Sequence, residues 1–221
     1  MTIDTSSRLP PTPYAPPKVS WEDFHDWSLR QEHRVEWVDG EIIELMPPSI
    51  RHQLIIRLLV FVMGLHAERN GLGMVVQDVQ MRLRSRPSGR VPDIVFVARE
   101  HESRVMLTYV DGPVDLAVEV VSPDSEIRDR KDKVTEYEAA RVREYWLIDE
   151  PRHEALFYVL SGDGTYVEAP IDEDGVYTST VLIGLRLRVD WLWRSPLPTF
   201  DEILAELPAL NAGASEPGKP R

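Results

Sequence analysis

The sequence predicts an α/β (α+β) protein in which a mixed central β-sheet is flanked by helices. Two short runs, Val91–Ala98 and Asp115–Ser122, are apolar along nearly their whole length, which is typical of strands covered on both faces. A helical stripe of apolar residues precedes them in Ile50–Arg69, and a polar helical stretch, Asp124–Arg143, follows them. Because helices and strands alternate, we expect one core sheet with helices packed on it.

The N-terminal part of the domain shows three local signals. Ser20 can cap a short helix that runs through Trp27. Asp39-Gly40 lies between two β-prone runs and is a strong short-range signal for a hairpin. Ser49 is a second candidate N-cap, and Asn70-Gly71 would end the helix that it begins.

The remaining elements follow from alternation and turn residues. Met74–Leu83 alternates along its length and predicts one strand, followed by a loop. Glu144–Asp149 predicts a further buried strand after the polar helix. Four strand-like runs punctuated by glycines then predict an added antiparallel meander, and Phe200–Leu207 a last helix.

The 221 residues are enough for one well-buried domain, which we expect at residues 19–210. Residues 1–18 are expected to form a disordered Pro-rich arm, and residues 211–221 a disordered tail. The absence of cysteine excludes disulfides and thiolate-bound zinc. The start shows no secretory signal, and the longest apolar region, Leu54–Leu65, is broken by Arg57. We therefore expect a cytoplasmic protein with no membrane partner.

The net charge of −12 argues against a passive nucleic-acid coat protein, because such proteins gain affinity by neutralising phosphates. It does not exclude an enzyme that acts on nucleic acid. A local basic stripe can still steer a polyanion over the roughly 8–10 Å that salt leaves unscreened.

Asp93 and Glu119 interrupt the two apolar runs. A carboxylate buried alone is costly, so it needs a cation, a hydrogen-bond donor or a proton. Two acids on successive core strands could share one Mg²⁺ ion, which prefers oxygen ligands. For Asp93 alone the neighbouring Arg90 and Pro92 favour a strand edge, but for the pair we favour a metal site.

The helix after Glu119 carries cations. Asp129, Lys133 and Tyr137 lie four apart and share one face. A lysine near a metal and a phosphate can orient or deprotonate the attacking water. The alternative is a solvated helix face with an ion pair between Asp129 and Lys133.

The densest basic run leads into the Asp93 strand and contains Arg82, Arg84, Arg86 and Arg90. Alternation places Arg82 and Arg84 on one strand face, from which they could grip phosphates. The alternative is a solvated edge strand protected by its charge.

The ordered set of motifs resembles the Uma-type putative restriction endonuclease family, a branch of the PD-(D/E)xK nuclease superfamily. The resemblance covers roughly Val19–Leu207. It rests on these residues: Glu36-Trp37-Val38-Asp39-Gly40, Pro47-Pro48-Ser49-Ile50-Arg51-His52, Pro92-Asp93, Glu119-Val120-Val121-Ser122-Pro123, Asp129, Lys133, Tyr137, Glu144-Tyr145-Trp146-Leu147-Ile148-Asp149 and Gly184-Leu185.

The resemblance implies a restriction-endonuclease-like mixed sheet, Mg²⁺ or Mn²⁺ as the metal, and DNA as the substrate. Asp93 and Glu119 match the two motif acids, and the backbone carbonyl of Val120 is implied as a further metal ligand. In the superfamily a lysine stands two residues after the second acid, where this chain has Val121. Lys133 matches the position where this family carries its lysine.

Three further residues gain a role from the resemblance. Glu36 matches an acid that supports the metal or its water. His52 matches a recurrent histidine, which would contact phosphate or water, or else pack locally at its helix start. Tyr137 would hydrogen-bond a site carboxylate, or else be a core aromatic. Cutting two strands with one site per chain leads us to expect a homodimer.

Three rival functions stay open. A protein of the same fold could bind nucleic acid or a protein partner without cutting, which Val121 and the acidic charge favour. A structural oligomer could use Trp21 and Trp27 to pack on another subunit. Glycoside hydrolysis also uses two carboxylates, but it leaves Lys133 and the arginine run unused.

Overall fold

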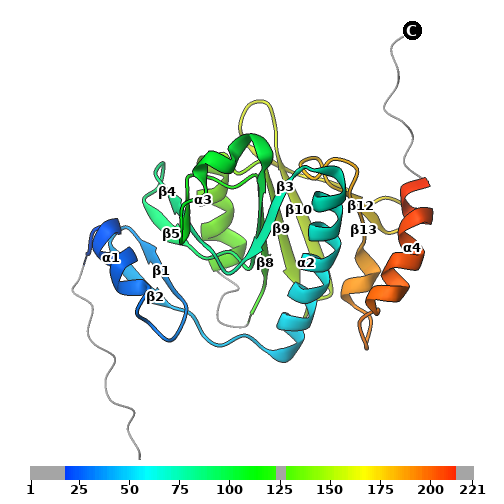
Figure 1. Ribbon diagram of the computed structural model, residues 1–221, viewed down its shortest axis with the longest axis horizontal. Coiled ribbons are helices and arrows are strands. Elements are labelled where there is room, and N and C mark those ends of the chain that lie inside the picture. The colour runs from blue at the N-terminus through cyan, green and yellow to red at the C-terminus, as the bar shows by residue number, and fades with distance from the viewer. Residues whose placement is uncertain (1–17, 123–127, 213–221) are drawn as a thin grey trace, which may run out of the picture.

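The computed structural model describes residues 18–122 and 128–212 (Figure 1). Nearly all of the expected arm and tail lies outside these residues, as does the expected start of the polar helix at 124–127. The last helix extends to Ala212, two residues into the segment expected as tail.

The larger sheet has six strands in the order β11-β10-β9-β8-β6-β3. Strands β8 and β9 are parallel, whereas every other neighbouring pair is antiparallel. The expected mixed central sheet is therefore confirmed. The bounds of its strands are β3 Gly73–Gln77, β6 Ile94–Ala98, β8 Leu116–Val120, β9 Glu144–Asp149, β10 Glu154–Leu160 and β11 Tyr166–Glu168.

A smaller sheet has five strands in the order β2-β1-β5-β4-β7, and two more strands, β12 and β13, pair with each other. The predicted Asp39-Gly40 hairpin is present as β1 and β2. The bounds are β1 Val35–Val38, β2 Glu41–Glu44, β4 Gln80–Leu83, β5 Ser88–Arg90, β7 Tyr109–Asp111, β12 Val176–Thr178 and β13 Arg186–Arg188.

The single strand predicted over Met74–Leu83 is wrong. The chain breaks at Asp78, whose φ of 55° is left-handed, and the two halves enter different sheets as β3 and β4. Aspartate tolerates this conformation better than most residues. A polar residue is also expected at every second position of a half-buried strand, so Asp78 does not interrupt the alternating pattern. The segment expected as the following loop also contains a short strand, β5. Likewise, the expected meander is split, because β10 and β11 extend the larger sheet while β12 and β13 stand apart.

Four α-helices are present among the described residues: α1 Trp21–Ser28, α2 Ile50–Asn70, α3 Val134–Ala139 and α4 Phe200–Ala212. Ser20 and Ser49 cap α1 and α2 as predicted, and Gly71 ends α2 in the left-handed conformation. A π-helix, Arg128–Lys133, leads directly into α3. Two 3₁₀ helices, Arg99–Arg104 and Val189–Leu192, complete the helical elements.

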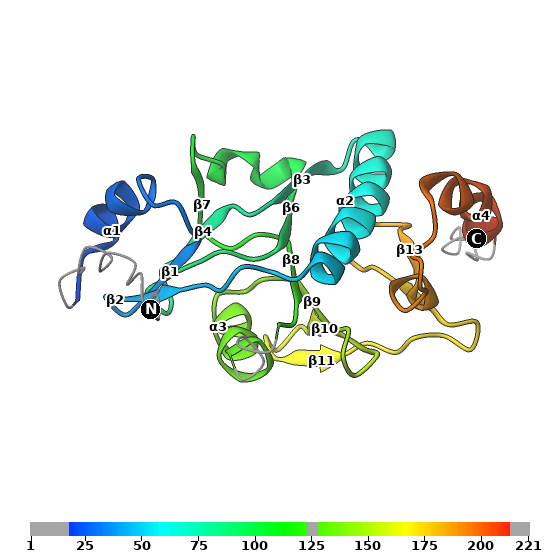
Figure 2. The same ribbon diagram turned by 90° about the horizontal axis from the view of Figure 1, so that it is seen from below.

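Helices α2 and α3 lie on opposite faces of the larger sheet, and α1 and α4 lie at opposite ends of the molecule (Figure 2). The α2 face packs an apolar cluster that includes Leu59, Phe96 and Trp146. The α3 face packs a second cluster, which includes Val95 and Tyr137. Every residue of β6 and β8 is buried, as their continuous apolar runs predict.

Helix α2 is long and apolar enough to cross a membrane, judged by its length and composition alone. Its longest apolar run, Leu54–Leu65, is nevertheless broken by Arg57. In the structure one side of α2 contributes to the core, including Ile55, Leu58 and Met63, which is also how the core helix of a globular domain looks.

Candidate active site

Asp93 and Glu119 lie side by side at one end of the larger sheet. Asp93 directly precedes β6, and Ile94 pairs with Val118 of β8, so Asp93 stands opposite Glu119. Asp93 Oδ2 accepts a 2.8 Å hydrogen bond from the backbone N–H of Val120. Both acids are buried, with 4% and 3% of their surface exposed. The structure therefore brings together the two carboxylates that the sequence places on neighbouring strands.

The ammonium group of Lys133 lies among three carboxylates. Its Nζ is 2.8 Å from Glu119 Oε1 and 3.1 Å from Asp129 Oδ1. The third carboxylate, Glu36, has its Oε1 at 3.3 Å. Burial by itself would lower the pKa of Lys133, but the charges of Glu119, Glu36 and Asp129 raise it above its usual value. Lys133 is therefore a fixed cation inside the site, not a side chain on a solvated helix face.

Lys133 reaches Glu119 from the helix side of the sheet. Val121, at the position where the superfamily carries its lysine, is buried in the apolar cluster under α3. Tyr137 belongs to the same cluster, and its hydroxyl donates a 2.9 Å hydrogen bond to Glu119 Oε1. Tyr137 is thus a core aromatic and a partner of a site carboxylate at once.

The side chain of Arg90 is buried and does not reach the protein surface. Its guanidinium donates two hydrogen bonds to Glu136, of 2.6 and 2.8 Å, and one of 2.8 Å to Glu36 Oε2. Only 2% of Arg90 is exposed. The expectation that Arg90 grips a phosphate is therefore wrong, because its donors are held inside the protein. Arg90 instead fixes Glu36, which in turn contacts Lys133.

Arg82 and Arg84 form ion pairs with acids other than Asp93 and Glu119. Arg82 Nη2 is 2.8 Å from Glu22, and its guanidinium stacks 5.2 Å from the centre of the Trp21 ring. Arg84 Nη2 is 2.6 Å from Asp111. Neither arginine is among the described residues that line the pocket at Asp93 and Glu119, so the phosphate contacts predicted for Arg82 and Arg84 stay a prediction.

His52 lies in the first turn of α2 and comes close to Asp93. Its Nε2 is 3.3 Å from Asp93 Oδ1, and its side chain is 8% exposed. Its backbone N–H donates to the Ser49 cap. The long helix therefore positions His52 from the opposite face of the sheet to that of Lys133.

Arg34 is a site residue that the sequence reasoning missed. Its guanidinium donates to Asp93 Oδ1 at 3.3 Å and to the backbone carbonyl of Val91 at 3.0 Å, and it lies 2.9 Å from Asp78. Arg34 stands two residues before Glu36, so alternation along the hairpin strand was the available signal.

The surroundings of the three site carboxylates shift their pKa values in opposite directions. Burial, together with Asp129, Asp93 and Glu36, outweighs Lys133 and raises the pKa of Glu119 to about 8. Burial also disfavours the charged form of Glu36, but the charges of Lys133 and Arg90 outweigh it and lower the pKa of Glu36 to about 2. For Asp93, contacts with His52 and Arg34 overcome burial and lower the pKa.

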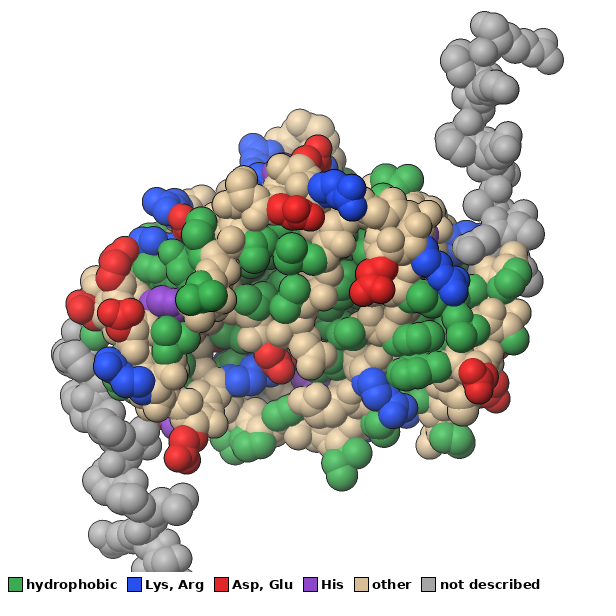
Figure 3. Space-filling model, in the orientation of Figure 1, with side chains coloured by type: hydrophobic (Ala, Val, Ile, Leu, Met, Phe, Trp, Pro, Cys, Tyr) green, Lys and Arg blue, Asp and Glu red, His purple; other side chains and the backbone are tan. Residues whose placement is uncertain are grey.

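A pocket opens onto these groups. Basic, acidic and histidine side chains gather just below the centre of the face in Figure 3, over the connection between β2 and α2. The described residues that line the pocket are Arg34, Leu45, Met46, Pro48, His52, Val91, Asp93, Glu119, Val120, Ser122, Arg128, Asp129 and Lys133. Val120, whose carbonyl was predicted as a metal ligand, is among them. Glu36, behind Lys133, is not.

A second group with metal-binding side chains lies at the other end of β8. Possible ligand atoms of Glu100, His101 and Asp115 lie within 4.8 Å of one another. Asp115 is already satisfied, because it accepts from His101 Nδ1 at 2.8 Å and lies 3.1 Å from Arg143 Nε. A metal at this end would have to displace the Arg143 charge.

Comparison with known proteins identifies the family. The family model for Uma2, described as "Putative restriction endonuclease", matches residues 21–190. The chain belongs to the Uma2 family. This Uma2 protein is 28% identical over 160 residues to the "Uncharacterized protein slr1290" of Synechocystis sp., covering 71% of the chain and 82% of that relative.

A solved structure shares the Uma2 fold. It is a "putative nuclease belonging to DUF820" from Anabaena variabilis, with a TM-score of 0.62 at 17% identity. The match covers 74% of this chain and 91% of that one. The nuclease-like fold predicted from the sequence is therefore confirmed.

Proposed function

We propose that this Uma2 protein is a Mg²⁺-dependent DNA endonuclease that hydrolyses phosphodiester bonds at the pocket formed by Asp93, Glu119 and Lys133. The observation that carries the proposal is the contact of 2.8 Å between Lys133 Nζ and Glu119 Oε1, beside a second buried carboxylate. Phosphoryl transfer builds up negative charge on the phosphate oxygens. Carboxylates that hold a metal ion, together with a fixed cation such as Lys133, can stabilise that charge.

The residues present fit a hard divalent cation. Asp93 and Glu119 both line the pocket and offer carboxylate oxygens, and Val120, the last residue of β8, also lines it and has a backbone carbonyl. Burial, and after it the charges of Asp129, Asp93 and Glu36, raises the pKa of Glu119, and an added cation would offset that negative charge. When bound, Mg²⁺ or Mn²⁺ would lower the pKa of water and offset charge on the phosphate.

The chain's own side chains have distinct roles in this proposal. Lys133 keeps its proton, because its pKa is raised, so it orients water or stabilises an anionic oxygen and does not act as a base. Tyr137 fixes Glu119 through its hydroxyl. Glu36 holds the ammonium group of Lys133 from behind and supports the site without contacting substrate.

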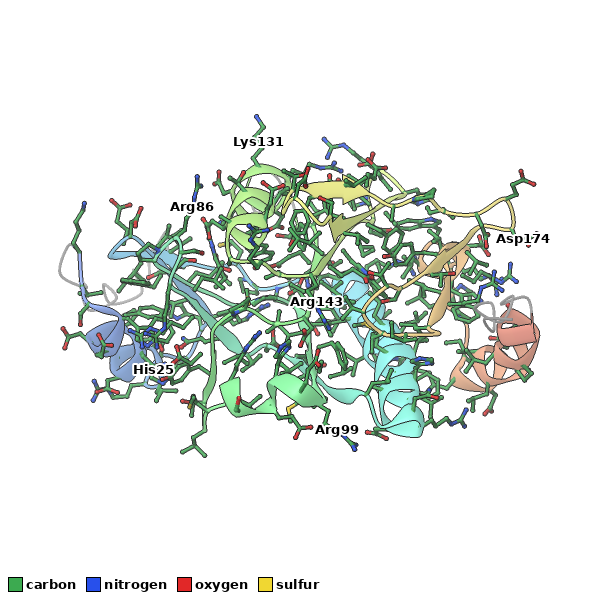
Figure 4. All side chains as sticks on the ribbon, turned by 90° about the horizontal axis from the view of Figure 1, so that it is seen from above. His25, Arg86, Arg99, Lys131, Arg143 and Asp174 are labelled. Atoms are coloured by element: carbon green, nitrogen blue, oxygen red, sulfur yellow. The ribbon has the colours of Figure 1, made fainter. Side chains whose placement is uncertain are left out.

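The test is plasmid cleavage with Mg²⁺ or Mn²⁺ by wild type and by Asp93→Ala, Glu119→Ala and Lys133→Ala. Lys131→Ala is the matched control, because Lys131 is exposed and projects from the same helical segment away from the molecule (Figure 4). We expect loss of cleavage in the three site variants and none in the control. Cleavage that survives Glu119→Ala would show that the site is elsewhere.

A second candidate function is binding without cutting. Two observations favour it: Val121 replaces the usual lysine, and Arg34 and Lys133 already neutralise Asp93 and Glu119. If wild type binds DNA or metal but leaves plasmid intact, this second function is supported. A cytoplasmic location and a homodimer, which would place two sites on one duplex, belong to the same proposal.

A further inference from the structure

His52 stands out as a buried polar group that lacks a hydrogen-bond partner. Neither Nδ1 nor Nε2 has one among residues 18–122 and 128–212. The side chain is 8% exposed and lines the same pocket as Asp93 and Glu119. Leaving such a group unsatisfied is costly, so its presence calls for a ligand or water.

The contact between His52 and Asp93 has the distance of two ligands on one ion. Nε2 and Oδ1 are 3.3 Å apart, just beyond the usual range of an N–H···O hydrogen bond, and Nε2 has no hydrogen-bond partner among the described residues. Metal bonds of roughly 2.0–2.2 Å at about 90–110° separate two ligand atoms by about 3.0–3.5 Å. Both atoms can therefore point to a common third position in the pocket.

We propose that His52 Nε2 is a metal ligand beside Asp93 and Glu119, so that the site binds a transition-metal dication such as Co²⁺ more tightly than Mg²⁺. The inference rests on the proposed metal site and names a third side chain in it. Imidazole suits first-row transition metals, whereas Mg²⁺ takes oxygen ligands and gains little from it.

The surrounding residues allow Asp93 to exchange its partner. Arg34 contacts Asp93 Oδ1 at 3.3 Å, where a metal would compete with it. Arg34 also lies 2.9 Å from Asp78 Oδ1, so it keeps a carboxylate partner if Asp93 turns to a metal. The N-terminal turn of α2, capped by Ser49, holds the backbone of His52 in place meanwhile.

Calorimetric titration with Co²⁺ and with Mg²⁺ tests the inference in wild type, His52→Phe and the control His66→Phe. Phenylalanine keeps the ring volume and removes the nitrogens. His66 lies on the same helix, where it contacts the carbonyl of Ile183 outside the pocket. We expect His52→Phe to weaken Co²⁺ binding at least tenfold and to change Mg²⁺ binding little, with His66→Phe like wild type.

Equal weakening of Co²⁺ and Mg²⁺ in His52→Phe would overturn the inference, because it would mean that His52 only supports Asp93. A wild-type readout that needs no variant is the spin-echo spectrum of bound Mn²⁺, which should show modulation from an imidazole nitrogen. Its absence, with Mn²⁺ binding still lost in Asp93→Ala, would reject His52 as a ligand and leave the proposed site standing. Failure of wild type to bind any of these metals would reject both.

Discussion

At the scale of single residues, the site is held by buried charges that neutralise one another. Arg90 donates hydrogen bonds to both Glu36 and Glu136, and Glu36 also forms an ion pair with Lys133. A buried pair contributes little net stability, but removing one partner leaves an uncompensated charge. The network therefore fixes the position of Lys133 more than it stabilises the fold.

The first prediction concerns Arg90. Arg90→Met should destabilise the protein by about 3–5 kcal/mol, because Glu36 and Glu136 would stay buried without their guanidinium partner. Urea unfolding would measure the change. Arg84→Ala is the control, because Arg84 forms an exposed ion pair and its loss should leave the unfolding midpoint unchanged. Equal midpoints for Arg90→Met and wild type would refute the role given to Arg90.

The second prediction concerns acid stability. The pKa of Glu36 falls from its ordinary value of 4.5 to about 2 in the folded protein. Its contribution to stability is therefore complete above pH 4.5 and is lost as the pH falls toward 2. Glu36→Gln should be less stable near neutral pH and should lose less stability between pH 5 and about pH 3 than wild type. Parallel stability curves for the two proteins over that range would contradict the assignment.

At the scale of elements, two glycines have contrasting surroundings. Gly89 in β5 packs against Trp21 of α1, whereas Gly64 in α2 has open space around it. A Cβ on Gly89 would lie 2.2 Å from Trp21 Cζ3, so Trp21 and the helix α1 that carries it would have to shift away from β5. A Cβ on Gly64, inside α2, would meet nothing within 4 Å. The two glycines are therefore present for different reasons.

The third prediction follows from that contrast. Gly89→Ala should destabilise by roughly 1–3 kcal/mol through overpacking. Gly64→Ala should stabilise by roughly 0.5–1 kcal/mol, because alanine loses less backbone entropy in a helix. Thermal unfolding of both variants beside wild type checks the signs. A stabilised Gly89→Ala would mean that α1 is free to move away from β5.

Strands with a continuous apolar pattern could be predicted from the sequence. A strand boundary that depends on the backbone torsion of one residue could not. The buried runs at Ile94–Ala98 and Leu116–Val120 carry their burial in their composition. The break at Asp78 depends on a single left-handed residue within an alternating run, so the pattern alone predicted one strand. Burial of Arg90 was equally hidden, because its partner Glu136 lies 46 residues away.

The candidate site was predictable to the extent that its residues interrupt apolar strands or match a motif. Asp93 and Glu119 stand out as acids in apolar runs, whereas Arg34 is one arginine in an ordinary polar context. Arg34 comes within 3.3 Å of Asp93 although the two residues are 59 positions apart in the sequence. Alternation with Glu36 could have indicated the strand face of Arg34, but a local pattern does not predict a partner so distant in sequence.

At the scale of the whole molecule, the proposed function would bring a polyanionic substrate to a protein with a net charge of −12. Most basic side chains that sequence reasoning assigned to phosphate contacts are paired elsewhere. Among the described residues that line the pocket, the cations are Arg34, Arg128 and Lys133. Attraction to DNA should therefore act locally, over the range that salt leaves unscreened.

The last prediction makes this quantitative. Each neutralised phosphate contributes about −0.9 to the slope of log affinity against log salt, so two or three cations predict a slope of about −2 to −3 per chain. Fluorescence anisotropy with labelled duplex DNA in chelator, which prevents cutting, would measure it. Arg128→Ala should make the slope shallower by about one, because Arg128 lines the pocket, whereas Arg84→Ala should leave it unchanged. A wild-type slope near −6 would instead require a basic surface outside the pocket, and DNA would then approach this acidic protein by a different face.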